Sequence, residues 1–216
     1  MQNEMEEMFE DWRGETAISG KHGGIKAASI ACVVEMMENM VFLSYSTNFM
    51  MYFMKSMHYP SAKAANMVTN FIGTSFLLTI FGGFVADSFL TRSAAFILFC
   101  SIELLGLILL TLQAHYPKLQ PHGDKTPSIL QATVLFTGLY AVATGVGGVK
   151  GSLPAHGGDQ IGSRNQRLIS GFFNWYFFSV CFGGFLAVTF MVWIEENKGW
   201  SSSALHFRYG IPNVSV

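Results

Sequence analysis

The sequence predicts an all-α membrane protein with five transmembrane helices, and three observations support this fold class. Half of the 216 residues are hydrophobic, only 12% are charged, and five stretches stay apolar for about 20 residues, the length that crosses a bilayer. This apolar content excludes a disordered chain. The formal net charge of −1, without a basic stripe, gives no support to nucleic-acid binding.

The predicted helices follow one another along the chain at residues 25–50, 67–85, 94–112, 129–149 and 172–194. The connection between the second and the third is short, which makes these two helices antiparallel neighbours. Prolines occur in the first and third connections, as expected of loops at the membrane surface. The polar region 150–171 is long enough to extend the fourth helix beyond the bilayer.

Three parts of the chain differ in composition. Residues 1–24 form an acidic N-terminal segment, with six acids within residues 4–15 and no signal-peptide pattern. Residues 25–200 contain the transmembrane bundle. Residues 201–216 form a tail without a spanning stretch.

Several kinds of site are not predicted. The cysteines and histidines are scattered, so neither a metal site nor a disulfide framework is expected, and no cofactor is predicted. The glycine-rich segment Gly145–Ser152 lacks the spacing of a P-loop and of a dinucleotide-binding turn. Its Gly147 and Gly151 instead favour a close contact between helices. The cysteines expected to be buried are Cys32, Cys100 and Cys181.

Four charged residues lie inside or at the edge of the predicted spans: Glu35 and Glu38 in the first, Glu103 in the third, and Lys150 at the end of the fourth. A charge at the bilayer centre costs about 2.5–3.5 kcal/mol on insertion scales, so such residues face a cavity or a partner. Glu35, Glu38 and Asn39 share one helical face. Two carboxylates this close do not easily ionise together in a low dielectric, which suits a group that binds and releases protons.

The expected partners of these charges remain open at this stage. Lys150 is the counter-charge of the glutamate pair if the fourth helix packs on the first, and a static ion pair between helices is the alternative. Glu103 is either a cavity residue or an acid near a helix end that reaches water. Asp87 and Arg92, in the short second connection, pair with each other or with a neighbouring helix end, and a plain surface pair in a turn is the alternative.

The ordered motifs of the chain resemble the proton-coupled oligopeptide transporter family of the major facilitator superfamily, specifically its plant nitrate and peptide transporter branch. The resemblance covers residues 11–200. Its motifs, in chain order, are Asp11-Trp12-Arg13-Gly14, Lys21-His22-Gly23-Gly24, Glu35-Met36-Met37-Glu38, Ala64-Ala65-Asn66, Gly73-Thr74, Gly82 to Arg92, Gly145 to Lys150, and Phe172 to Phe177.

The resemblance implies a charge network. Glu35 and Glu38 match the carboxylates of the family's helix-one motif, which is associated with proton coupling, and Lys150 matches the helix-four lysine of the same network. Asn39 stands where the family has a basic residue, so uniport or altered coupling is the alternative to proton symport.

The resemblance also implies a gate and a substrate cavity. Asp87 and Arg92 match the superfamily's gate motif between helices two and three, which would hold a cytoplasmic latch. Asn174 matches a residue that faces the central cavity, where Asn39 and Glu103 are also expected.

The family fold consists of two six-helix halves, so this chain is expected to supply most of the N-terminal half. Gly210-Ile211-Pro212 resembles the opening of helix six, which predicts a chain truncated at that point. Six lysine and arginine residues lie on each side of the predicted bundle, so the excess of positive charge that marks the cytoplasmic side is missing. The cytoplasmic placement of residues 1–24 therefore rests on the resemblance. The plasma membrane is the expected location, with the vacuolar membrane as the alternative.

The function implied is transport and not enzymatic catalysis. The expected solutes are small and anionic or peptide-like: nitrate, peptides, or plant hormones such as abscisic acid and gibberellin, moved by alternating access with protons. Because alternating access needs two halves around one site, these residues alone are not expected to transport. The alternative is a truncated, non-transporting membrane protein that associates with full-length relatives.

Overall fold

The computed structural model describes residues 23–121, 126–161 and 166–198. Within these residues it forms five α-helices, each with an apolar window long enough to cross a membrane, and no β-strand. The predicted fold class is therefore confirmed. The predicted tail 201–216 and all but the last two residues of the predicted segment 1–24 lie outside the described residues. The helices are α1 (Ile25–Met51), α2 (Ser61–Ser88), α3 (Arg92–His115), α4 (Ile129–Asp159) and α5 (Gln166–Lys198).

The helices are longer than the apolar stretches that indicated them. A π-helical segment, η1 (Tyr52–Ser56), continues α1, while α4 runs nine residues past Lys150 to Asp159. α4 begins in a capping box, in which the Ser128 hydroxyl accepts from the Gln131 N–H at 3.4 Å and the Gln131 side chain accepts from the Ser128 N–H at 2.9 Å. Pro154 lies inside α4 and has no N–H to donate to the carbonyl of Lys150, four residues earlier.

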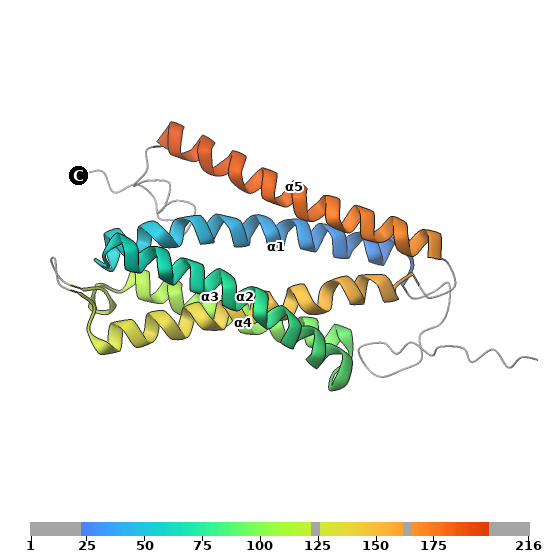
Figure 1. The fold of residues 1–216 in the computed structure, drawn as a ribbon, viewed down its shortest axis with the longest axis horizontal. Helices are drawn as coiled ribbons and strands as arrows, with labels where there is room; N and C mark the ends of the chain where they lie inside the picture. Colours follow the sequence, from blue (N-terminus) through green and yellow to red (C-terminus); the bar gives the residue numbers. More distant parts are fainter. Residues whose placement is uncertain (1–22, 122–125, 162–165, 199–216) are drawn as a thin grey trace, which may run out of the picture.

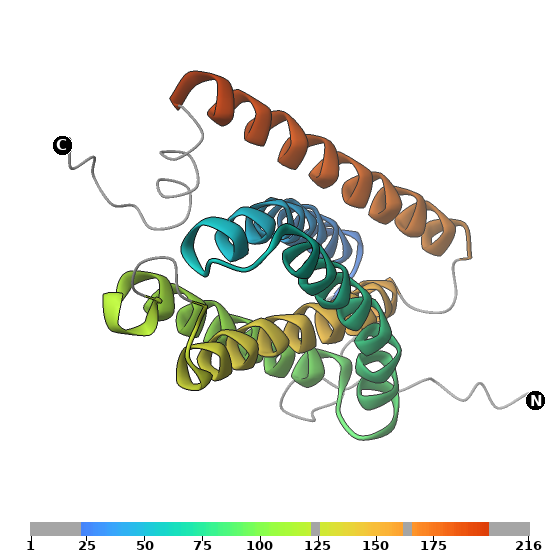
Figure 2. The same ribbon diagram turned by 60° about the vertical axis from the view of Figure 1, so that its left-hand side comes forward.

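α4 lies at the centre of the packing. It makes its most extensive contacts with α3 and α2, while α5 packs mainly along α1 (Figure 1). The view in Figure 2 shows the same division, with α5 on one side of α1 and helices α2, α3 and α4 on the other. The helices alternate in direction, so the start of α1, the α2–α3 turn and the end of α4 meet at one end of the bundle.

Glycines on two faces of α4 permit this close packing. A Cβ added at Gly151 would lie 2.4 Å from the carbonyl oxygen of Thr79 on α2, and one at Gly148 would lie 2.0 Å from the ring of Phe99 on α3. Gly147 faces α2 in the same way as Gly151. The expected small-residue contact therefore forms, and it brings α4 against two helices at once.

The cysteine prediction is wrong in one case. Cys32 and Cys100 are half-buried, but Cys181 on α5 is exposed. The reason is the position of α5, which packs mainly on α1 and leaves its opposite face open. That open face carries large apolar side chains, including Phe178 and Phe185, as expected of a surface that meets lipid or another apolar partner.

Candidate functional site

Glu35 is the most deeply buried carboxylate of the predicted charge network. It lies on α1 and is 2% exposed. The Nζ of Lys150, on α4, lies 3.3 Å from its Oε1, and the Tyr176 hydroxyl, on α5, donates to its Oε2 at 2.5 Å. One carboxylate therefore ties three helices together, and both of its oxygens have a partner.

Asn39 lies one turn after Glu35 and joins the same helices. Lys150 Nζ donates to Asn39 Oδ1 at 3.4 Å, and Asn39 Nδ2 donates to the carbonyl oxygen of Val180 on α5 at 2.8 Å. A second cation at this position would repel Lys150, whereas the amide accepts from it. Asn39 thus leaves Lys150 as the cation of the cluster.

Glu38 shares the face of Glu35 but not its partners. Its Oε1 is buried and finds no hydrogen-bond partner among the described residues. The carboxylate is attracted by Lys150 and repelled by Glu35. A buried polar atom without a partner costs about 1–3 kcal/mol, so a proton, water or solute that binds it would be stabilised there.

Glu103 is buried and does not reach water at a helix end. It is 7% exposed in the middle of α3, and a Cβ added at Gly145 of α4 would lie 2.4 Å from its Cβ. Its carboxylate interacts electrostatically with Glu38 and Lys150. The absence of a side chain at Gly145 allows α3 to carry this acid into the contact with α4.

Asn174 is not brought to the cluster. It is exposed on α5, whereas Tyr176, two residues later, is 6% exposed and contacts Glu35. Tyr176 was not among the site residues predicted from the sequence. The available signal was the hydroxyl itself, because a tyrosine within an apolar span usually finds a hydrogen-bond partner.

The predicted gate residues form a second charged site at the end of the bundle. Arg92 Nε lies 3.2 Å from Asp87 Oδ1, and Arg92 Nη1 is paired with Asp159 at the end of α4. Beside them, the Ser93 hydroxyl lies 3.3 Å from His156 Nδ1. Both expected pairings of Arg92 therefore occur together, and Asp159 was not predicted as its partner because it lies 67 residues away in the sequence.

The glycine pair before α1 is fixed at this same end. Gly23 and Gly24 adopt φ angles of 80° and 87°, which favour glycine, and the Gly24 N–H donates to the carbonyl oxygen of Gln160 at 2.6 Å. A Cβ at Gly23 would lie 3.0 Å from that oxygen. The start of α1 is thereby attached to the end of α4.

The Arg92–Asp159 pair is expected to contribute little to stability. Its side chains are 36% and 30% exposed, and exposed pairs measure about 0.2–1 kcal/mol in double-mutant cycles. We therefore propose a double-mutant cycle with Arg92→Gln and Asp159→Asn, in which thermal unfolding in lipid nanodiscs measures stability. The coupling energy between the two residues should lie in that range and should fall at high salt. A coupling energy of several kcal/mol that does not respond to salt would contradict this expectation.

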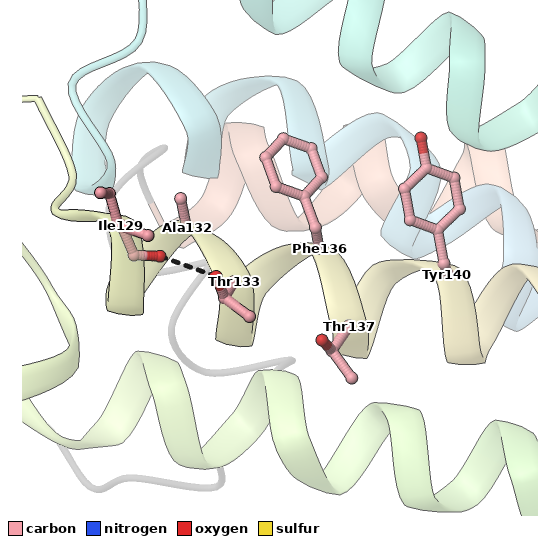
Figure 3. A pocket seen from close by; sticks show the side chains of 6 residues that line it. All are labelled: Ile129, Ala132, Thr133, Phe136, Thr137 and Tyr140. Carbon is pink, nitrogen blue, oxygen red and sulfur yellow. Dashed lines mark hydrogen bonds between the residues drawn. The ribbon is translucent and has the colours of Figure 1, made fainter.

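A shallow groove lies on α4, away from the charge cluster. Figure 3 shows Phe136 and Tyr140 on one side of the helix and Thr137 on another, with the Thr133 hydroxyl bonded at 2.9 Å to the carbonyl oxygen of Ile129. Its lining is mostly apolar. Tyr140 precedes Lys150 by ten residues, or about 15 Å along the helix, so the groove does not contain the charged site.

Comparison with known proteins identifies the family of this chain. The sequence model of the POT family matches residues 93–216. The chain belongs to this family. The match covers more than half of the chain, and the five described helices, each long and apolar enough to cross a membrane, agree with a multi-pass membrane protein.

Relatives from Arabidopsis thaliana match almost the whole chain of this POT family member. It is 84% identical over 203 residues to Protein NRT1/ PTR FAMILY 4.1, covering 94% of this chain and 39% of the relative. It is 68% identical over 200 residues to Protein NRT1/ PTR FAMILY 4.2, covering 93% and 38%, and 43% identical over 220 residues to Protein NRT1/ PTR FAMILY 4.6, covering 97% and 36%. The chain thus spans less than two fifths of the length of these relatives.

Proposed function

We propose that this chain forms part of a secondary transporter that moves small anionic or peptide-like solutes by alternating access, coupled to protons at Glu35, Glu38 and Lys150. The observation that carries the proposal is the buried Lys150–Glu35 contact of 3.3 Å beside Glu38, whose buried Oε1 has no hydrogen-bond partner among the described residues. Intramembrane ionisable groups are expensive, and a transport or proton pathway is their usual role.

The contacts suggest how proton binding affects helix packing. When Glu35 is ionised, its attraction to Lys150 holds α1 against α4. A proton on Glu35 or Glu38 removes one negative charge facing Lys150, so the cation loses part of its compensation. An anionic solute that enters the cavity then gains from binding near Lys150, which links the proton to the solute.

The proposed solutes are nitrate, peptides or a carboxylate hormone such as abscisic acid, because each except a neutral peptide carries a negative charge that Lys150 attracts. The proposed location is the plasma membrane, with the N-terminus on the cytoplasmic side. In that orientation the Arg92 site, where α2, α3 and α4 meet, would be a cytoplasmic gate, with Asp159 added to the predicted Asp87 and Arg92.

Uptake at two pH values tests this function. The matched residues of Protein NRT1/ PTR FAMILY 4.1 are replaced by this chain, and the chimera is expressed in oocytes supplied with labelled nitrate or abscisic acid. We expect uptake that rises as the external pH falls, and we expect Glu38→Gln to abolish that pH dependence because the proton acceptor is lost. Asp124→Asn, in the predicted third connection, is the matched control and should keep the dependence.

Two results would contradict the proposal. An unchanged pH profile in Glu38→Gln would favour the static ion pair between helices. A chimera that reaches the membrane but takes up neither solute, while this chain co-purifies with its relatives, would favour the non-transporting alternative.

A further inference from the structure

Three side chains of α1 surround the ammonium group of Lys150, and they lie on successive turns of one helical face. Glu35, Asn39 and Phe42 are spaced four and three residues apart, which brings helix positions into line. Lys150 Nζ lies 3.3 Å from Glu35 Oε1 and 3.4 Å from Asn39 Oδ1. It also lies over the ring of Phe42, 5.4 Å from the ring centre. The N–H groups of the ammonium thus have a carboxylate, an amide and an aromatic face as neighbours.

The ammonium is not held closely by Glu35. A hydrogen bond between an ammonium and a carboxylate is usually about 2.7–2.9 Å long, so the contacts of Lys150 with Glu35 and Asn39 are both long. The Tyr176 hydroxyl, in contrast, donates to the other oxygen of Glu35 at 2.5 Å. Lys150 therefore lies between its three neighbours on α1 and is not bound tightly to any one of them.

The ring of Phe42 is fixed in place by α1 and α2. Phe42 is 4% exposed, and its ring centre lies 6.0 Å from that of Phe71 on α2 and 5.7 Å from that of Tyr45, which it meets edge to face. A cation within about 6 Å of a ring centre is attracted to the ring face, and the attraction is stronger where water is excluded. The side chain of Lys150 is 15% exposed, so the contact with Phe42 lies in mostly desolvated surroundings.

Titratable groups on several helices also act on this contact. Those that interact electrostatically or by hydrogen bonds with Lys150 or Glu35 are Glu38 and Cys32 on α1, Glu103 on α3 and Tyr176 on α5. α2 meets the ring with Phe71, and its own charged residues, Lys63 and Asp87, lie near its two ends. Once Glu35 is neutral, Glu38 and Glu103 are therefore the groups that compete with the Phe42 ring for the cation.

We propose that the Phe42 ring is a second binding position for the Lys150 ammonium and holds this cation when Glu35 takes up a proton, so that Phe42 is a positioning residue of the transporter. In that step a proton from water forms an O–H bond with a Glu35 oxygen, and Lys150 keeps its three N–H bonds. The ammonium loses the attraction of the carboxylate but keeps that of the ring, so it stays charged and available to an anionic solute. This role rests on the proposed function, whereas the contact itself is measurable without transport.

Fluorination of the Phe42 ring tests the contact. Fluorine withdraws electron density from the ring face and changes the size of the ring little, so one, two and three fluorine atoms weaken a cation–π contact stepwise. The fluorinated phenylalanines are incorporated at position 42 of the full chain, and denaturant unfolding in mixed micelles gives the folding equilibrium constant. With three fluorine atoms we expect this constant to fall about two- to fivefold in the wild type. We expect a larger fall in Glu35→Gln, whose neutral side chain imitates the protonated carboxyl group, and no fall in Lys150→Met.

Phe71 supplies the matched control. It is fully buried, and in the part of the chain that the structure describes its ring contacts other aromatic rings and no cation. The same fluorine series at Phe71 should therefore change the folding equilibrium constant equally in the wild type and in Lys150→Met.

Three outcomes would overturn the proposal. A series at Phe42 without effect in the wild type, or with the same effect in Lys150→Met, would show that the ring only fills space. A fall in Glu35→Gln no larger than in the wild type would mean that the cation moves to Glu38 or Glu103 and not to the ring. If Lys150→Met does not fold, the comparison of the wild type with Glu35→Gln still decides. Failure of uptake in the chimera, with the fluorine effect present, would reject the transport function alone.

Discussion

Lys150→Met is expected to destabilise the bundle by about 3–5 kcal/mol, the cost of removing one partner from a buried ion pair. Methionine keeps the length of the side chain but removes the charge that lies 3.3 Å from Glu35. Glu35, 2% exposed, would then be held by Tyr176 without a counter-ion. Denaturant unfolding of the chain in mixed micelles, followed by circular dichroism, measures the change.

Two variants control this experiment. Lys63→Met removes an exposed lysine that lies 4.6 Å above the ring of Tyr59, and it should cost no more than about 1 kcal/mol. Adding Glu35→Gln to Lys150→Met removes the unpaired charge and should restore part of the lost stability. Equal effects of Lys150→Met and Lys63→Met would show that the ion pair does not hold the helices together.

Gly151→Ala is expected to separate α4 from α2. The new Cβ would lie 2.4 Å from the carbonyl oxygen of Thr79 and 2.6 Å from the backbone nitrogen of Gly83, and neither backbone atom can turn away as a side chain does. Overpacking of this kind costs about 1–3 kcal/mol or more. We expect a lower unfolding midpoint in nanodiscs, measured by the thermal loss of helical circular dichroism.

The matched control is Gly73→Ala on α2. Nothing lies within 4 Å of a Cβ at this position, so alanine should leave stability unchanged or raise it by up to about 1 kcal/mol through its higher helix propensity. The contrast between the two variants isolates the contact at Gly151. Similar midpoints for both would contradict the close packing of α2 and α4.

The sequence was sufficient to predict the number and kind of helices, because long apolar stretches separated by polar turns have few other stable forms. It also placed Glu35 and Asn39 on one helical face and offered Lys150 as the counter-charge if the fourth helix packs on the first, since helical spacing and the cost of a buried charge can be read from the sequence. The ends of the helices were harder to predict from the sequence. The helix α4 continues through Lys150 and Pro154 to Asp159, and its polar end contacts α3 through His156 and Asp159, which hydropathy does not register.

The parts of the candidate site that were not predicted depend on contacts between residues far apart in the sequence. Tyr176 meets Glu35 across 141 residues, and Arg92 meets Asp159 across 67. Their pairing depends on which face α5 turns to α1 and on how far α4 extends. Asn174 and Tyr176 lie in one motif, yet only Tyr176 points at the cluster, because two residues on a helix differ in direction by about 200°.

Solid-state NMR of the chain in lipid bilayers, with carboxyl carbons of glutamate and Nζ of lysine labelled, tests whether Lys150 pairs with the Glu35 carboxylate while Glu38 holds a proton. At neutral pH we predict a carboxylate signal in dipolar contact with one lysine Nζ, lost in Glu35→Gln, and a separate carboxylic acid signal lost in Glu38→Gln. A lysine contact that persists in Glu35→Gln without weakening, or an ionised Glu38 in the wild type, would contradict the account.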